Sequence, residues 1–327
     1  MSQSEVNGVI VPRLSIGMAV FNGADLIAQA LDSLLAQTFT DFELIVSDNG
    51  STDATEAICR AYAARDERIR YVRHTVNQGP AFNFAYVLDE ARAEYFMFAA
   101  HDDLWDPEFA ARLTDALERD PGAVLAFSRW DAINQRGEHI SDFDTNWPDI
   151  LGKSLFARFW SFITLDEART LKALFYYGVM RRDIWRDAFH WGNRYHAYAG
   201  SDVLMILRML NRGSFAFIDR VLFHNRIRPL QKRDAEPLGD YVRRRARGRS
   251  AGHRGSATAF VSRMHEYYSG VRAAVRATQD LTKLERAILI ATAFARESSA
   301  YVILFPIAVL RELGVVPPPT LARAAEI

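Results

Sequence analysis

The sequence lacks several features that would assign it at once to a class of protein. Cysteine occurs once, at Cys59, so the chain can form no internal disulfide, which favours a reducing compartment. No window contains the roughly 20 uninterrupted apolar residues of a membrane-spanning helix. The N-terminus has no basic segment followed by an apolar run, so we expect no signal peptide. These absences predict a cytoplasmic protein, or one bound peripherally at the inner face of the cell membrane.

Three further absences concern ligands. Formal net charge is zero, which argues against nucleic acid as a partner. No Gly-x-Gly-x-x-Gly follows the first expected strand, which counts against a dinucleotide-binding domain. Neither a Walker-type loop nor the Gly-rich, Arg-bearing loop of sugar nucleotidyltransferases is found, so two common kinds of phosphate-binding loop are missing.

The chain does have a large apolar content and a regular alternation of strands and helices. With 327 residues, 49% of them hydrophobic, it can form one large domain plus an appendage, or two domains. Strands separated by helices of ten to fifteen residues predict right-handed crossovers and a parallel sheet. We expect strands at 14–20, 42–46, 69–72 and 94–99, and helices at 24–36, 53–64 and 81–91.

The fourth expected strand leads directly into two adjacent carboxylates. Residues 94–99 are almost wholly apolar and aromatic, as in a strand covered on both faces. Asp102 and Asp103 follow, and Asp106 with Pro107 is typical of a helix start. Neighbouring carboxylates repel each other unless a cation lies between them. Because open α/β sheets bind ligands at the carboxyl ends of their strands, we infer a divalent metal that holds a phosphorylated ligand.

Five motifs in order resemble glycosyltransferase family 2. They are Ala19-Val20-Phe21-Asn22, then Ser33 with Gln37, then Glu43 to Asp53 (ELIVSDNGSTD), then Asn77-x-Gly79-x-Ala81-x-Asn83, then His101-Asp102-Asp103-x-Trp105-x-Pro107. The match covers residues 13–120 well and extends more loosely to about 230. It implies the GT-A fold, a Rossmann-like mixed α/β sheet flanked by helices, and an inverting, hexosyltransferase-like enzyme that uses nucleotide-sugar donors.

The resemblance also implies roles for particular residues. Backbone near Phe21 and Asn22, with the Asp48 carboxylate, would hold the nucleobase, although Asp48 could instead be a turn residue. Asp102 matches the last aspartate of the family's Asp-x-Asp, and with Asp103 it would bind Mn²⁺ or Mg²⁺ bridging the donor diphosphate. The further donor-binding residues expected are Val20, Asn77, Gly79, Asn83 and His101. Asp53 is better explained as the cap of the second helix.

Two departures from the family pattern leave alternatives open. Ala100 replaces the first aspartate of the metal motif, and Phe82 replaces the arginine usual before Asn83. A site with so few carboxylates would bind metal weakly until the donor supplies its phosphates. A non-catalytic nucleotide-sugar-binding or scaffold protein of the same fold is therefore one alternative, and a sugar nucleotidyltransferase is a weaker one.

The second half of the expected core, residues 121–230, should hold the acceptor. We expect a strand at 124–133, a long loop with some helix at 138–165, and a strand at 177–182. Two short strands are expected at 215–218 and 221–224. The aromatic side chains of the loop could stack on a sugar or belong to the core; they include Trp147, Phe156, Phe159, Trp160 and Phe162.

Asp202 is the expected catalytic base. It follows Ser201 at the start of a helix that runs to about Asn211, where the family has an acid that takes the acceptor's proton. The alternative is a first-turn acid that interacts with the helix dipole. Arg226 and Arg228 occupy the place of the family's Arg-x-His, and either could bind the leaving diphosphate or be a surface arginine.

After residue 230 the composition changes. Residues 242–249 (VRRRARGR) are basic, and helices are expected at 256–278 and 283–295, with an apolar stretch at 301–310. Residues 241–313 could contact an anionic membrane, or the helices could pack on the catalytic domain or on a second subunit. We thus expect a GT-A domain at 1–230, with its donor half at 13–120, and a helical extension at 231–327. The expected acceptor is a growing polysaccharide or lipid-linked glycan of the cell envelope.

Overall fold

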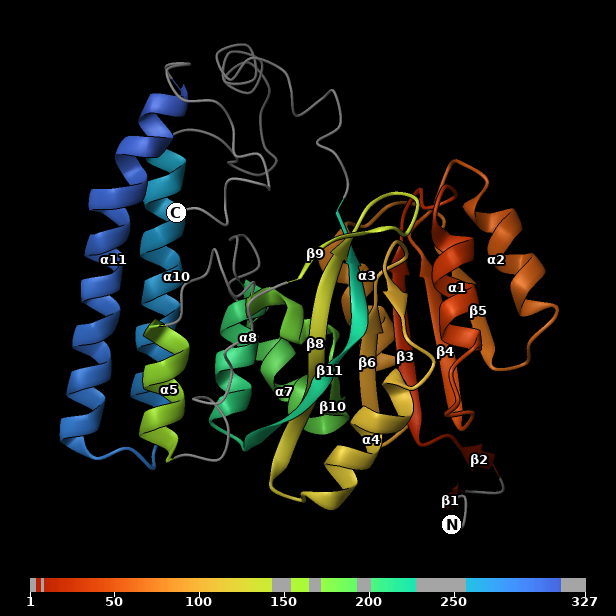
Figure 1. The fold of residues 1–327 in the computed structure, drawn as a ribbon, viewed down its shortest axis with the longest axis horizontal. Coiled ribbons are helices and arrows are strands. Elements are labelled where there is room, and N and C mark those ends of the chain that lie inside the picture. Colours follow the sequence, from red (N-terminus) through yellow and green to blue (C-terminus); the bar gives the residue numbers. More distant parts are fainter. Residues whose placement is uncertain are drawn as a thin grey trace. The chain divides into compact units, whose positions relative to one another are not determined.

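A computed structural model describes residues 4–6, 9–142, 154–164, 172–192, 201–227 and 257–312. The chain forms two compact units, whose elements are labelled in Figure 1. The first consists of Met1–Thr145, Ala173–Asn193 and Arg212–Ile227. The second consists of Asn146–Lys172, Arg194–Asn211 and Arg228–Ile327. Two segments from before residue 230 therefore group with the C-terminal extension.

The first half of unit 1 alternates strands and helices, as the sequence predicts. Its elements are β3 (Leu14–Val20), α1 (Ile27–Leu35), β4 (Phe42–Asp48), α2 (Thr55–Ala63), β5 (Ile69–Arg73), α3 (Pro80–Asp89) and β6 (Tyr95–Ala99). β3 pairs in parallel with β4 and β6, and β4 pairs in parallel with β5. β3, β4 and β6 are buried over nearly their whole length, which explains their continuous apolar sequences.

The second half of unit 1 adds antiparallel strands to this sheet. Its elements are β7 (Leu104–Trp105), α4 (Phe109–Arg119), β8 (Ala123–Ile133), β9 (His139–Asp142), the 3₁₀ helix η1 (Lys172–Tyr177), β10 (Val179–Arg181), α7 (Arg182–Gly192) and β11 (Ser214–Arg226). The nine strands follow the order β5-β4-β3-β6-β10-β8-β11-β7, with β9 paired to β8 (Figure 1). β1 (Ser4–Val6) and β2 (Val9–Val11) form a separate hairpin. The sheet is therefore mixed, and the expected fold class is confirmed.

One expectation about strands was wrong, and one strand was not anticipated. The two short strands expected at 215–218 and 221–224 are one strand, β11, whose register against β8 shifts at Ile218/Val221. Asp219 and Arg220 are exposed at this irregularity, and their polarity made the sequence resemble a turn. Leu104 and Trp105, for which the sequence predicted no strand, form β7 because they pair with His224 and Phe223 far along the chain.

A polar cluster joins the amino ends of β3, β4 and β6. Glu43 is 4% exposed and accepts hydrogen bonds from Ser15 Oγ at 2.7 Å, from the Arg92 guanidinium at 2.7 Å and from the Arg92 N–H at 3.1 Å. Ser15 Oγ in turn accepts the Ala93 N–H at 3.0 Å. Burying the Glu43 carboxylate costs little here, because a hydroxyl, a backbone N–H and a guanidinium replace its hydrogen bonds to water. The cluster aligns the strands at the edge opposite the loops that follow their carboxyl ends.

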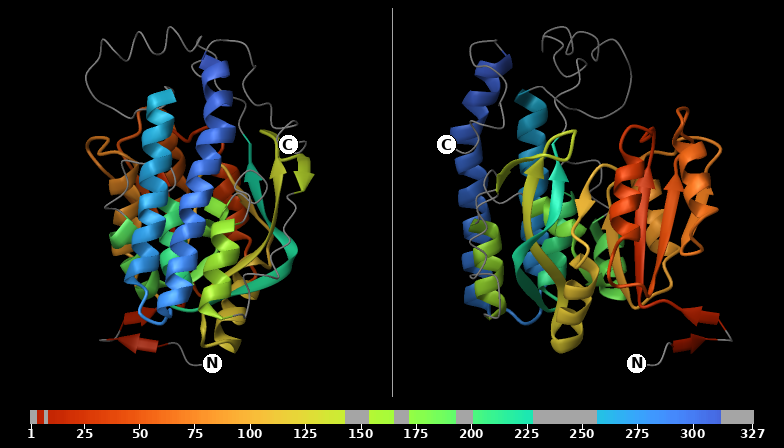
Figure 2. Two further views of the ribbon diagram at one scale, coloured as in Figure 1. Left: turned by 90° about the vertical axis from the view of Figure 1, so that its left-hand side faces the viewer. Right: turned by 45° about the vertical axis from the view of Figure 1, so that its right-hand side comes forward.

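Unit 2 is helical in the part of the chain that the structure describes. Its elements are α5 (Leu155–Thr164), α8 (Ser201–Leu210), α10 (Ala257–Ala277) and α11 (Lys283–Glu312). Figure 2 shows α10 and α11 as two long neighbouring helices. Phe159 and Phe162 of α5 are at most 1% exposed, so these two aromatics belong to the core. At Gly270 an added Cβ would lie 2.5 Å from Leu204 Cδ1, so a side chain there would force Leu204 of α8 to shift.

A buried ion pair connects α10 and α11. Arg272 and Glu297 are 4% and 5% exposed and form an ion pair, while the Arg272 guanidinium lies 4.1 Å from the ring centroid of Phe294. α11 continues through residues 301–310, which the sequence suggested as a separate apolar stretch. Among the described helices, none combines the length and hydropathy required to cross a bilayer.

The Glu43 cluster gives a test of the fold. Replacing Glu43 with alanine removes the acceptor of both Ser15 and Arg92, and we expect a loss of about 2–3 kcal/mol in unfolding free energy. Urea denaturation followed by circular dichroism measures it. The matched control is Glu94→Ala, whose side chain is 67% exposed and pairs with Arg181 at 3.1 Å. That change should cost less than about 1 kcal/mol. Equal losses in the two variants would contradict the role assigned to Glu43.

Candidate active site

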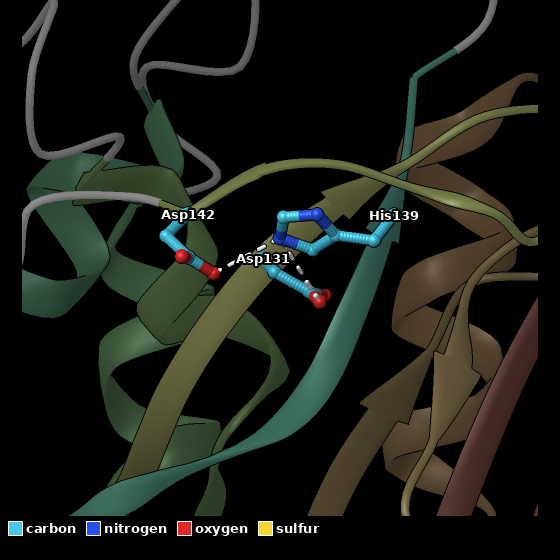
Figure 3. Close-up of side chains that lie close together, drawn as sticks. All are labelled: Asp131, His139 and Asp142. Carbon is cyan, nitrogen blue, oxygen red and sulfur yellow. Dashed lines mark hydrogen bonds and ion pairs between the residues drawn. The ribbon is translucent and has the colours of Figure 1, made fainter.

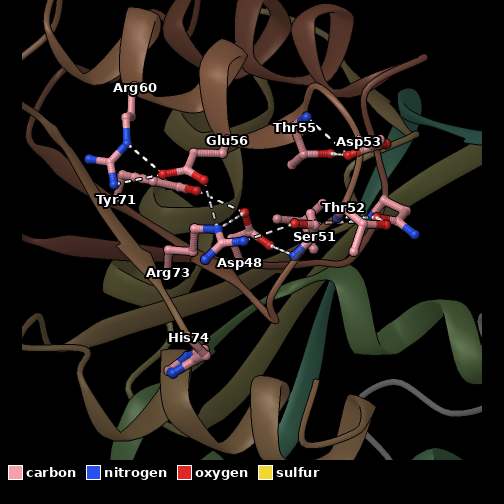
Figure 4. Close-up of polar contacts among 12 residues, drawn as sticks. Asp48, Ser51, Thr52, Asp53, Thr55, Glu56, Arg60, Tyr71, Arg73 and His74 are labelled. Atoms are coloured by element: carbon pink, nitrogen blue, oxygen red, sulfur yellow. Dashed lines mark hydrogen bonds and ion pairs between the residues drawn. The ribbon is translucent and has the colours of Figure 1, made fainter. Parts of the chain in front are cut away.

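The loops that follow β3, β4, β5 and β6 meet at one edge of the sheet because these strands are parallel. Figure 4 shows polar side chains at the end of β4 and in the loop after it, with those of α2 and β5 around them. Most residues singled out from the sequence lie in this region. Their contacts divide them into residues that build the edge and residues that face outward from it.

The loops after β3 and β4 are held together by alternating hydrogen bonds. The Asn49 N–H donates to the Val20 carbonyl at 2.9 Å, and the Asn22 N–H donates to Ser51 Oγ at 2.9 Å. The Thr52 N–H donates back to Asn22 Oδ1 at 2.8 Å. Asn22 has a φ of 53°, a left-handed conformation that asparagine tolerates better than most residues. The side chain of Asn22 is therefore used within the loop.

Asp53 connects these loops to the start of α2. Its carboxylate accepts the N–H of Thr55 at 3.0 Å and that of Ala24 at 3.1 Å. Ala54 occupies the cap position of α2 and makes no side-chain cap, so Asp53, one residue earlier, supports the first N–H of the helix and also binds the first loop. Burial would raise the pKa of Asp53, but the hydrogen bonds from Thr55 and Ala24 lower it below its ordinary value. The carboxylate therefore stays charged.

Asp48, expected to bind the nucleobase, is completely buried at the end of β4. One carboxylate oxygen accepts the Ser51 N–H at 2.7 Å, and the other accepts the Tyr71 hydroxyl at 2.8 Å (Figure 4). Arg73 Nε lies 3.9 Å from that second oxygen. Burial, together with the hydrogen bond to Asp48, raises the pKa of Tyr71, so the phenol remains a donor. The structure places Asp48 beneath the loops as an internal acceptor.

Asn49, which sequence reasoning overlooked, organises the loop after β5. Its amide donates to Asn77 Oδ1 at 2.9 Å and to the Gly79 carbonyl at 3.0 Å, and it accepts the Gln78 N–H at 3.0 Å. Gly79 has a φ of 89°, which favours glycine. The only signal in the sequence was the position of Asn49 beside Asp48. Asn77 and Gly79, expected to bind the donor, are thus held by Asn49.

Asn83 fastens α3 to the ends of two strands. It is 3% exposed, and its amide donates to the carbonyls of Val20 at 3.2 Å and Ser47 at 2.9 Å. The Ser47 hydroxyl donates to Asn83 Oδ1 at 2.6 Å. All of these atoms are in the interior, so Asn83 supports the edge from below.

Asp102 and Asp103 differ sharply in environment. Asp103 is 2% exposed, and it accepts the Arg226 N–H at 2.7 Å and the Asn225 amide at 3.2 Å. Asp102 is half-buried. Burial, and then the charge of Asp102, raise the pKa of Asp103 to about 7, although the bonds from Arg226 and Asn225 oppose this. Asp102 is thus the more accessible carboxylate, and Asp103 binds the loop to β11.

Arg226 braces the same loop. Its guanidinium donates to the carbonyls of Asp102, Asn134 and Gln135 at 2.5 to 2.8 Å and to Gln29 Oε1 at 3.0 Å. The residue is 5% exposed, so the structure assigns its donors to the protein interior. Asn225 was not anticipated, because nothing in the sequence relates it to Asp103. Arg228 lies outside the described residues.

Two other predicted residues lie at the surface of this edge. Phe21 is 41% exposed at the end of β3. His101 packs on Gly23, where an added Cβ would lie 2.6 Å from His101 Cδ2. Together with Asp102, they surround the ends of β3 and β6. This arrangement can present an aromatic face, an imidazole and a carboxylate to a ligand.

Asp202, the expected base, lies in the first turn of α8 in unit 2. Its side chain is outside the described part of the structure. Trp160 of α5, one of the loop aromatics, is 40% exposed. Trp147 lies outside the described residues.

A mixed sheet of this topology, with polar loops at the carboxyl ends of its parallel strands, is that of a GT-A glycosyltransferase domain. The family model described as glycosyl transferase family 2 matches residues 15–180, about half of the chain. The chain therefore belongs to glycosyl transferase family 2, and the resemblance found in the sequence is confirmed.

Curated relatives match part of the chain. An uncharacterized glycosyltransferase of Rickettsia typhi is 32% identical over 130 residues, 39% of this chain and 40% of that protein. An uncharacterized protein of Mycobacterium tuberculosis is 36% identical over 134 residues, 40% of this chain and 38% of that protein. The chain thus spans about two fifths of the length of these relatives.

Solved structures resemble nearly the whole chain. Residues 1–349 of S. aureus TarS in complex with UDP align with a TM-score of 0.61 at 17% identity, over 96% of this chain and 87% of that chain. The same fragment in complex with UDP-GlcNAc gives a TM-score of 0.59 at 16% identity, over 96% and 87% of the two chains. At this identity the likeness establishes the fold.

The buried position of Asp48 yields a test with a matched pair of tyrosines. Tyr71→Phe removes a donor from a fully buried carboxylate, and we expect a loss of about 1.5–3 kcal/mol in unfolding free energy. Tyr62→Phe is the control, since its hydroxyl donates to Asp32 at 2.7 Å on the surface. It should change stability by less than about 0.5 kcal/mol. Urea denaturation of both variants measures the difference. If Tyr71→Phe unfolds with the same free energy as the wild type, Asp48 is not the internal acceptor described above.

Proposed function

We propose that this protein is an inverting glycosyltransferase that moves a hexosyl-type sugar from a nucleoside diphosphate to an acceptor hydroxyl. The observation that carries the proposal is the contrast at the end of β6. Asp103 is held by Asn225 and Arg226, while Asp102 is the more exposed carboxylate of the pair. Membership of glycosyl transferase family 2 supports the same reaction class.

The donor would bind across the carboxyl ends of β3 and β6. Phe21 offers an exposed aromatic face to the base, next to the backbone of Val20 and Asn22. Asp48, Asn77, Gly79 and Asn83 would keep this surface in shape through the internal hydrogen bonds described above. His101 would contact the donor beside Asp102. The UDP and UDP-GlcNAc complexes of S. aureus TarS make uridine donors the first to test.

The residues present fit a divalent metal whose ligands come partly from the donor. Asp102 supplies one carboxylate, and Asp103, Arg226 and Asn225 hold its loop in place. Oxygen ligands suit Mg²⁺ or Mn²⁺. When bound, such an ion would stabilise the charge that develops on the departing nucleoside diphosphate. Arg228 is the cation that we assign to the same leaving group, because the guanidinium donors of Arg226 are used inside the protein.

Asp202 would act as general base. A carboxylate at the start of α8 can accept the proton of the acceptor hydroxyl, whose oxygen then attacks the anomeric carbon from the side opposite the leaving diphosphate. A single displacement of this kind inverts the anomeric configuration. The acceptor we propose is a growing polysaccharide or a lipid-linked glycan of the cell envelope. Residues 241–313 would mediate peripheral contact with the inner face of the membrane or with a second subunit.

A second candidate is a nucleotide-sugar-binding protein that has lost catalysis. Ala100 at the end of β6, in place of an aspartate, favours it because it removes one metal ligand. Calorimetry with nucleoside diphosphates, with and without Mn²⁺, separates the two. Binding that does not depend on metal, together with no turnover, would support the binding protein.

We predict that sugar transfer depends on a divalent metal and on Asp102. Chelation with EDTA should abolish sugar transfer, and Mn²⁺ should restore it. Asp102→Asn should lower turnover by at least about 100-fold and raise the Mn²⁺ concentration needed for half-maximal rate, because one anionic ligand is lost. Asp115→Asn on α4, whose side chain is 49% exposed, is the control and should leave the rate unchanged. Full activity of Asp102→Asn would refute the metal role.

Asp202 gives the next prediction. Asp202→Asn should reduce transfer by about 10²–10⁴-fold, as for the loss of a general base, with donor binding unchanged. Product formation and calorimetric titration of the donor measure the two effects. Asp219→Asn, on the exposed part of β11, is the control. If Asp202→Asn retains the wild-type turnover, the base must be another group.

A further inference from the structure

A second cluster of metal-ligating side chains lies on β8 and β9, apart from the residues assigned to the donor. Asp131, His139 and Asp142 each direct one ligand atom to a common region, and these three atoms lie within 4.8 Å of one another. His139 Nε2 is 3.0 Å from Asp142 Oδ1 and 4.0 Å from Asp131 Oδ2. Figure 3 shows both carboxylates approaching the same ring nitrogen. No residue proposed to bind the nucleotide sugar belongs to this cluster.

The strand register explains how the three side chains come to share one face. Asp131 pairs with Asp142 across the antiparallel strands, and Ile133 pairs with His139. The register shifts between Ala132 and Ile133, so β9 carries one extra residue at this point. In a regular strand, side chains three positions apart point to opposite faces. The bulge therefore turns His139 toward the side of Asp142.

This placement is unfavourable without a cation. Two aspartates directly opposite each other on neighbouring strands repel. Asp131 is 6% exposed, so water screens its charge little. All four side chains of β9 are exposed, so burial of apolar surface does little to hold this strand against β8. A divalent ion between the carboxylates would neutralise the repulsion and fasten β9.

Asp131 is already oriented from its other side. His224 of β11 is its direct neighbour in the sheet, and His224 Nδ1 lies 2.7 Å from Asp131 Oδ1. This contact leaves Oδ2 on the side of His139. A histidine that hydrogen-bonds a ligating carboxylate is a common way of orienting a metal ligand.

We infer that Asp131, His139 and Asp142 form a binding site for a divalent ion such as Zn²⁺, which holds β9 against β8. One imidazole and two carboxylates suit Zn²⁺ better than Mg²⁺, which prefers oxygen ligands alone. Ligand atoms around a tetrahedral zinc lie about 3.4 Å from one another, between the two separations that His139 makes. A water molecule would complete four-coordination. The site is independent of the proposed sugar transfer.

The experiment measures zinc binding to tag-free, chelator-treated full-length protein by calorimetry, with ZnCl₂ as titrant and no nucleotide present. We expect one ion per chain, with affinity lowered at least tenfold in His139→Ala and in Asp142→Asn. His190→Ala is the matched control. Its side chain is 53% exposed, as is that of His139, and it lies 3.6 Å from the single carboxylate of Asp89. This variant should bind zinc like the wild type.

Two further readouts locate the bound ion on the sheet. In the wild type, zinc should slow amide hydrogen exchange in residues 139–142, and His139→Ala should abolish that effect. Asp102→Asn should bind zinc normally, since Asp102 is not one of the three ligands. Zinc binding that is lost in Asp102→Asn but kept in His139→Ala would overturn the proposal. So would the absence of zinc binding in the wild type, in which case the cluster is an ion-pair network centred on His139.

Discussion

The buried carboxylate of Asp48 is the constraint on which the loops at the carboxyl edge of the sheet depend. A charge with no exposure to solvent must be compensated inside the protein, and here the Ser51 N–H and the Tyr71 hydroxyl do so from two different segments. These contacts fix where the chain leaves β4 and where β5 lies beside it. The loop after β3 then adds its own hydrogen bonds to the same segment, through Asn22 and Asn49. The polar residues of the family motifs therefore act largely on one another.

A second buried carboxylate performs the same task on the other side of β6. Asp103 joins the loop after β6 to β11 through the Arg226 N–H, and the Arg226 guanidinium returns to the Asp102 carbonyl. More than 100 residues separate these partners in the chain, so the position of Asp102 depends on the second half of the sheet. In the proposed mechanism this support matters because a metal site with few protein ligands needs each of them in place. Asp102, which we propose to contact the substrate, is thus distinct from the buried charged residues that support it, Asp103 and Arg226.

β8 connects both regions. It pairs with β10, β11 and β9, and it carries Asp131 in the row that also contains Asp142 and His224. The bulge in β9 places His139 and Asp142 on one face, and the irregularity in β11 coincides with the exposed Asp219 and Arg220. Such irregularities are commonly found where a strand must redirect a side chain. In β9, the bulge would direct His139 toward the proposed zinc ion.

Local patterns in the sequence determined most of the first hundred residues: the alternation of buried strands with helices, the parallel sheet, and the loops that carry Asn22, Asp48 and Asp102. These follow from apolar runs and turn residues, whose effects act over a few positions. Tertiary structure alone decided that Asp48 and Asp103 are internal acceptors, that Asn225 and Arg226 brace Asp102, and that residues 214–226 form one strand. It also brought Asp131, His139 and Asp142 together. Each of these depends on pairing between distant strands, and the pattern of either segment by itself contains no information about its partner.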